Sequence, residues 1–174
     1  MQKHLGRAPR VSHLPPVTAR RAHDMIMSFS TPVAILLGGL IAGTLDIGAA
    51  ALTNGRSPLV ILLVIASGLL GKAAFQGGLP AVALGLVLQW LMSLIIAAIY
   101  VLVSNRIPEL KQHWIAGGLA YGVGIFVVMN YGVVPLSEIG RIPQFTLWTF
   151  GGNVLAMLGF GLLIAFFARG SLSG

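Results

Sequence analysis

The sequence predicts an all-α membrane protein with about four transmembrane helices and one short glycine-rich segment. Only 9% of its 174 residues are charged, whereas soluble domains carry roughly 25%. Uncharged apolar runs recur from Thr31 onward, and a helix of about 20 such residues crosses a hydrocarbon core about 30 Å thick. Clusters rich in Gly, Pro, Asn and Ser, which are typical of turns, separate these runs.

The chain begins with a polar, basic stretch over residues 1–27 that holds too few apolar residues to form a core. We therefore expect a disordered cytoplasmic tail, followed by a helical transmembrane domain over residues 28–170. Met25 and Met27 are alternative start residues, so the interpretation does not depend on the tail.

The segment 58–75 differs from the other apolar runs in length. Its uncharged part covers only 14 residues, from Pro58 to Gly71, before Lys72 interrupts it. This length favours a short re-entrant or interfacial helix over a full span. Full spans are expected over about residues 32–52, 81–103, 114–134 and 145–168.

The distribution of Lys and Arg tests whether the segment 58–75 crosses the membrane. If it does not cross, a cytoplasmic N-terminus places eight of the 11 basic residues inside and three outside. If it crosses, the division is seven against four. The positive-inside rule favours the four-span arrangement modestly, although the tail supplies five basic residues in both counts. We therefore expect a multi-pass protein of the bacterial inner membrane with a cytoplasmic N-terminus.

Several classes of function lack the residues that they need. The basic residues form no face interleaved with aromatic rings, so nucleic acid is not an expected partner. The chain has no cysteine, only four acidic residues and no metal-ligand spacing among its histidines. Motifs for nucleophiles, zinc hydrolases and phosphate loops are missing. We expect no catalytic residues, no metal and no cofactor; the expected partner is the lipid bilayer, and the small residues favour a homo-oligomer.

Asp46 is the outstanding residue, because an ionisable group inside an apolar run costs at least about 2.5–3.5 kcal/mol on insertion scales. At helical spacing it shares a face with Gly39, Gly43 and Ala50, so we expect it to face another helix. One interpretation makes it a proton or cation site with Lys72 as its partner. The other makes it a packing residue that hydrogen-bonds the backbone near the helix end.

Three further polar residues lie inside the predicted spans. Gln89 shares a strip with Gly85 and Ser93, Asn130 precedes Pro135 by about one turn, and Asn153 lies early in the last span. With Asp46 and Lys72 they could line a polar pathway. They could equally join helices by hydrogen bonds worth about 0.6–2 kcal/mol each.

Three sequence patterns resemble a group of small, uncharacterised bacterial inner-membrane proteins over roughly residues 35–168. The patterns are Gly39–Ile47, the segment from Ala66 to Gly71 with Ala74-Phe75 and Gly77-Gly78 after it, and Met129-Asn130 followed by Val133–Ser137. The resemblance implies that these motifs are shared features, and it implies no activity. Gln89 stands where the group's pattern leads us to expect a histidine, and Lys72 is an unusual charge after Gly71.

Two functions remain open from the sequence. The first is a non-enzymatic integral membrane protein with a compact glycine-rich bundle. The second is a small transporter or channel for protons, cations or a small solute that uses Asp46.

Overall fold

The computed structural model describes residues 30–140 and 144–171, so the tail expected over residues 1–27 lies outside the described residues. The elements found in the described residues are all helices, several of them long and apolar enough to span a membrane, which confirms the predicted fold class. In chain order they are α2 (Thr31–Asn54), α3 (Pro58–Leu70), the 3₁₀ helix η1 (Gly71–Gln76), α4 (Gly78–Arg106), α5 (Pro108–Gln112), α6 (Trp114–Val127), the π-helix η2 (Val128–Val133), α7 (Val134–Leu136) and α8 (Leu147–Arg169).

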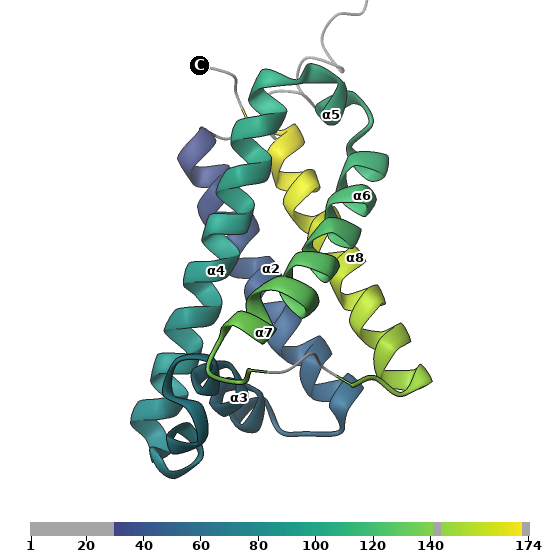
Figure 1. Ribbon diagram of the computed structural model, residues 1–174. Helices are drawn as coiled ribbons and strands as arrows, with labels where there is room; N and C mark the ends of the chain where they lie inside the picture. Colours follow the sequence, from purple (N-terminus) through teal and green to yellow (C-terminus); the bar gives the residue numbers. More distant parts are fainter. Residues whose placement is uncertain (1–29, 141–143, 172–174) are drawn as a thin grey trace, which may run out of the picture.

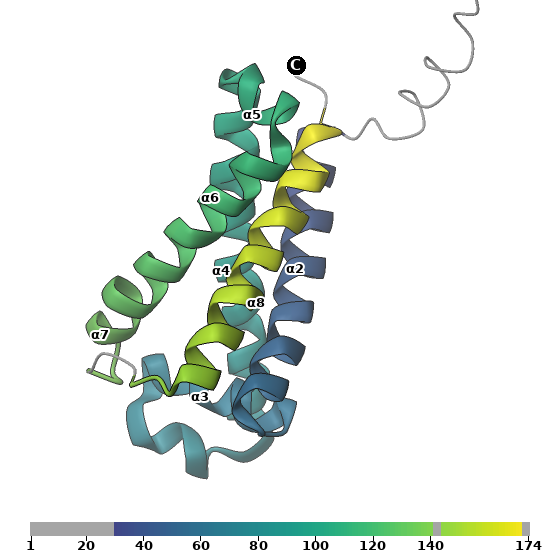
Figure 2. The ribbon, with the colours of Figure 1, turned by 90° about the vertical axis from the view of Figure 1, so that its right-hand side faces the viewer.

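Four long helical segments run along the bundle in alternating directions (Figure 1). α2 begins at the end of the bundle that carries α5, and α8 finishes there. We call this the α5 end and the opposite one the α3 end. α2 and the continuous run of α6, η2 and α7 lead from the α5 end to the α3 end, and α4 and α8 lead back (Figures 1 and 2).

The segment of α3 and η1 stays at one end of the bundle. By length and composition alone Pro58–Gln76 could cross a membrane, as could four other segments of the described chain. However, α2 ends and α4 begins at the α3 end, with α3 and η1 between them (Figures 1 and 2). Gly71 ends α3 with a φ of 57°, a conformation that suits glycine. The arrangement of the helices is therefore that of the four-span prediction.

Two boundaries differ from the sequence prediction. α4 begins at Gly78 rather than near residue 81, because Pro80 lies in the first helical turn, where no intrahelical donor is needed. The span expected over 114–134 is not a regular α-helix, since its last part widens into η2. Pro135 lies two residues after the end of η2 and has no N–H to donate, so the backbone carbonyl one turn before it must find another partner.

Glycine contacts set the spacing between the helices. A Cβ added to Gly39 or Gly43 of α2 would meet Leu94 or Ser93 of α4, as expected for the face that carries Asp46. In a bilayer, small residues at such contacts let backbones approach closely enough for favourable packing. The same pattern joins α3 to α4 and α6 to α8 through Gly85, Gly118, Gly122 and Gly161.

Polar contacts tie the helices together at the α5 end. Asn105 at the end of α4 donates to the Thr31 hydroxyl over 3.2 Å and accepts from the Ser171 hydroxyl over 2.9 Å. Lys111 of α5 donates to the Ser171 carbonyl over 2.8 Å, and partial burial lowers the pKa of its ammonium group. The ends of α2, α4 and α8 are thereby held together around one set of hydrogen bonds.

Replacing Gly122 by Ala should destabilise the bundle, because the new Cβ would lie 2.9 Å from the Leu158 Cα of α8 and must displace backbone. We expect a loss of about 1–3 kcal/mol, the usual cost of overpacking, in thermal unfolding of the detergent-solubilised protein. Gly124→Ala is the matched control, since nothing lies within 4 Å of a Cβ there. Equal melting temperatures for the two variants would contradict the assigned α6–α8 contact.

Candidate functional site

The structure brings together four of the five residues predicted to form a polar pathway. Asp46 and Gln89 share a hydrogen bond. Asp46 also lines a cavity of about 150 Å³ with Asn130 and Asn153. These residues come from α2, α4, η2 and α8, so the site lies where four segments far apart in the sequence converge. We call the cavity the Asp46 chamber.

A hydrogen bond between α2 and α4 holds Asp46 in place. The Gln89 Nε2 donates to Asp46 Oδ2 over 3.0 Å and to the Gly43 carbonyl over 3.2 Å. The second contact requires a close approach of the helices, which a Cβ at Gly43 would prevent by meeting the Ser93 side chain. Within the described part of the chain, the other oxygen of Asp46 has no hydrogen-bond partner.

The two asparagines add amide groups to the chamber. Asn130 is buried in η2, and its Nδ2 donates to the Phe126 carbonyl one turn earlier over 2.8 Å. This hydrogen bond stays within the run of α6 and η2 and joins no other helix of the described chain. Among the described residues, the buried Oδ1 of Asn153 has no hydrogen-bond partner. A residue of the chamber wall thus carries an acceptor that the described chain leaves unsatisfied.

Lys72 is not part of the site, so the predicted pairing of Lys72 with Asp46 was wrong. Lys72 follows Gly71, where the chain leaves α3, and it is exposed on η1 at the α3 end. No ion pair involves it among residues 30–140 and 144–171. The amide of Gln89 occupies the position that the prediction gave to a cation, and the Asp46 carboxylate has no cationic partner in the described chain.

Other residues of the chamber were not predicted. Thr53 and Asn54 extend its wall along the last turns of α2, and Met129 and Met157 contribute apolar surface. The place of Thr53 could have been predicted from the sequence, because Asp46, Ala50 and Thr53 recur at helical spacing and so share one face of α2; Asn54 follows next to it. No sequence pattern predicted the methionines, because they line the chamber only through the way in which η2 and α8 pack.

The chamber has the chemistry of a cation or proton site. A carboxylate with one free oxygen and amide oxygens close by are the hard ligands that small cations prefer. A carboxylate is also a group that can carry a proton. Among the described residues, no group of three or more His, Asp or Glu side chains could hold a metal ion. The ligand would therefore interact with one carboxylate and neutral dipoles.

The Gln89–Asp46 bond can be measured by a double-mutant cycle with Gln89→Leu, Asp46→Leu and the double variant. We expect a coupling energy of about 0.6–1.7 kcal/mol, the range found for hydrogen bonds between membrane helices. The readout is the free energy of unfolding in mixed detergent. Additive effects of the two substitutions would show that the bond contributes nothing to stability.

Comparisons with protein-family models, with curated proteins and with solved structures found no match. The resemblance to a group of small inner-membrane proteins therefore stays a prediction. The function of this multi-pass helical protein must be argued from the geometry of the Asp46 chamber.

Proposed function

We infer that this protein is a non-enzymatic membrane transport protein in which Asp46 binds the proton or small cation that is carried. One observation supports the proposal above the others: an oxygen of an intramembrane carboxylate, without a partner in the described chain, lines a cavity that also holds Asn130 and Asn153. A residue that only fastened two helices would be expected to use both of its oxygens for the protein itself.

The energetic cost of a carboxylate in a span supports the binding of a positive ligand. An acidic side chain at this depth costs at least about 2.5–3.5 kcal/mol on insertion scales and is normally paired. Here Gln89 supplies one neutral hydrogen bond, and the described chain supplies no cation. A bound proton or cation would neutralise the charge and offset that cost.

The course of the chamber suggests that a ligand reaches Asp46 from the α3 end of the bundle. The chamber follows α2 from Asp46 past Ala50 to Asn54, the last residue of that helix. Asn54 lies eight positions after Asp46, which corresponds to about 12 Å along the helix axis. Towards the α5 end Asp46 also lines a second cavity of about 170 Å³ between α2 and α8. Beyond that cavity the bundle is closed by a packed core that includes Ala97, Val101, Ile164 and Ala165. Transport would require the packed part of the bundle towards the α5 end to open in turn.

A packing role is the second candidate, and the Gln89–Asp46 bond favours it. This bond joins α2 and α4 at the place where Gly43 lets them approach. Under this alternative the protein is a compact integral membrane protein without a transported substrate. The two candidates differ in whether the charge of Asp46 is needed when the fold is intact.

Asp46→Asn should abolish the flux of protons or small cations such as Na⁺ and K⁺ into proteoliposomes, because the amide keeps the shape of the carboxylate and removes its charge. Flux is followed with a pH-sensitive or cation-sensitive dye trapped in the vesicles. Glu138→Gln is the matched control: it makes the same chemical change at an exposed residue of the loop after α7, and it should leave flux unchanged.

Folding of each variant is checked by monodisperse elution and by its melting temperature. Flux in the wild type that persists in a well-folded Asp46→Asn variant would overturn the role of Asp46. No flux of any tested ion in the wild type, together with a less stable Asp46→Asn variant, would favour the packing role.

The proposed location is the bacterial inner membrane with the N-terminus in the cytoplasm. Among the described residues, Arg106, Lys111 and Arg169 lie at or next to helix ends of the α5 end. Arg56 and Lys72 belong to the segment at the α3 end. Together with the five basic residues of the tail, this division follows the positive-inside rule. The chamber would then open towards the periplasm.

Single-cysteine labelling can test this orientation, because the chain has no cysteine of its own. In intact spheroplasts, Arg56→Cys should react with a membrane-impermeant maleimide, whereas Gln112→Cys of α5 should react only after the membrane is opened. Both positions are exposed, so a difference in labelling reports the side of the membrane. The reverse pattern would place the α5 end outside.

A further inference from the structure

We propose that the Asp46 chamber also takes a lipophilic cation, which reaches it sideways from the bilayer with its hydrocarbon chain in the space between α4 and α6. This proposal rests on the proposed function, since it uses Asp46 as the site of the positive charge. It goes further by adding a second class of cation that Asp46 can bind and a second route by which it arrives.

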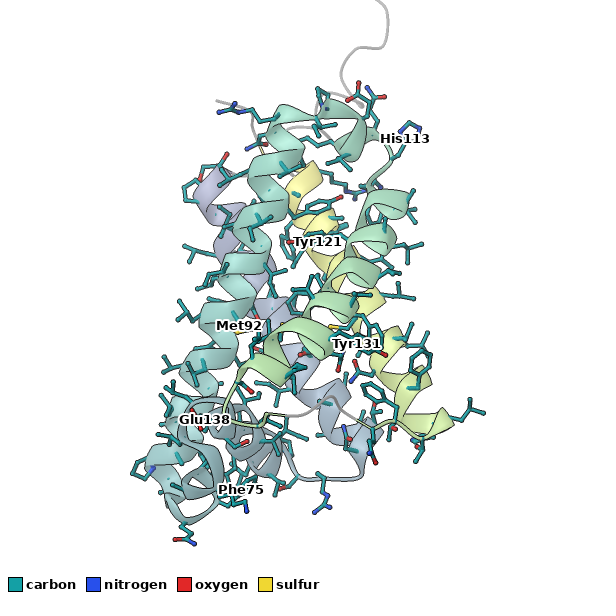
Figure 3. The ribbon with its side chains drawn as sticks, in the orientation of Figure 1. Phe75, Met92, His113, Tyr121, Tyr131 and Glu138 are labelled. Carbon is teal, nitrogen blue, oxygen red and sulfur yellow. The ribbon has the colours of Figure 1, made fainter. Side chains whose placement is uncertain are left out.

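The first observation is an apolar groove of about 420 Å³ between α4 and α6. The only hydroxyl in its lining belongs to Tyr121, and it donates to the Ile96 carbonyl over 2.8 Å, so it is already satisfied. α4 and α6 meet towards the α5 end, where the ring centroids of Tyr100 and Tyr121 are 4.9 Å apart. The two helices diverge towards the α3 end (Figure 2). Figure 3 shows Met92 of α4 and Tyr121 of α6 in the space between these helices.

The groove opens towards lipid. Ile95 and Ile99 of α4 line it and are each 51% exposed, and Val128 lines it from the other side and is 60% exposed. α4 and the segment Trp114–Leu136, which includes α6, are each long and apolar enough to span a membrane, so the medium around the groove is hydrocarbon. A hydrocarbon chain is the molecule that can fill such a groove without losing hydrogen bonds to water.

The second observation is that the groove continues towards Asp46. A cavity of about 300 Å³ adjoins the groove and shares Met92, Met129 and Val133 with it. Gln89, which donates to Asp46, also lines this cavity. The Asp46 chamber shares Met129 and Val134 with this cavity. Met129 therefore lines all three spaces.

The residue at this junction is suited to act as a gate. Methionine is unbranched and flexible, so its side chain can move without strain. Met129 also lies in η2, and short π-helical turns occur frequently at functional sites. The groove and the adjoining cavity each have a volume at or above the roughly 300 Å³ typical of the smallest ligand pockets.

Charge decides which amphiphile fits. A cationic head that passed from this cavity into the Asp46 chamber would meet the Asp46 carboxylate, to which the described chain offers no other cation. The phosphate of an anionic lipid would be repelled there, and the head of a neutral amphiphile would leave the charge unpaired. A single positive charge on one hydrocarbon chain satisfies both the groove and the carboxylate.

The test measures binding of dodecyltrimethylammonium to the full-length protein in lipid nanodiscs by titration calorimetry. Gly124→Leu fills the groove, because Gly124 lines it and a Cβ there meets nothing within 4 Å. Gly48→Leu is the matched control: its Cβ is equally unobstructed, and Gly48 of α2 lines neither the groove, the cavity nor the chamber. Ile99→Phe fills the groove from α4 and serves if Gly124→Leu does not fold.

We expect dissociation constants at least about tenfold higher for Gly124→Leu and Asp46→Asn, and unchanged for Gly48→Leu. Equal binding by Gly124→Leu and Gly48→Leu would overturn the groove as the site of the chain, while small-cation flux that depends on Asp46 would still support the proposed function. Weaker binding by Gly124→Leu with unchanged binding by Asp46→Asn would overturn the placement of the charged head. Tetramethylammonium, which lacks the chain, should bind about tenfold more weakly or worse to the wild type.

Discussion

The contact between α2 and α4 at Gly43 is the constraint on which the site depends. Because Gly43 has no side chain, the Gln89 amide can reach both the Gly43 carbonyl and the Asp46 carboxylate. Asp46 held in this way also lines the chamber, whose other walls come from η2 and α8. A bulkier residue would separate the helices, and the bond, the orientation of the carboxylate and the shape of the chamber would change together.

Much of this arrangement could be predicted from the sequence, because insertion into a bilayer leaves few options. Apolar runs of sufficient length must be helices that satisfy their own backbone hydrogen bonds, and a charge among them must find protein or water. These two rules predicted the four long helices and the inward position of Asp46. They also predicted that Gln89, Asn130 and Asn153 are polar features of the bundle interior.

The remaining details could not be predicted, since hydrophobicity does not distinguish lipid-facing from buried positions when lipid is the solvent. Leu45 and Ile47 flank Asp46 and are equally apolar, yet Leu45 is 57% exposed and Ile47 only 7%. The pairing with Gln89 rather than Lys72 depends on where the chain after α3 turns, which Gly71 decides through its local backbone. The widening at η2 likewise depends on which donors the backbone carbonyls before Pro135 find, and no simple sequence pattern predicts those donors.

The two ends of the bundle differ in how firmly they are joined. At the α5 end, Asn105, Lys111 and Ser171 link several elements, and the aromatic rings of Tyr100 and Tyr121 lie against each other. At the α3 end, α6 and its continuation through η2 stand apart from α4, with Glu138 of the following loop donating its backbone N–H to the Gly68 carbonyl. α6 packs closely against α8 at Gly118, Gly122 and Gly161. Any widening of the lipid-facing groove would therefore have to move α6 and α8 as one unit away from α4, and Met129, which lines both the groove and the chamber, would move with them.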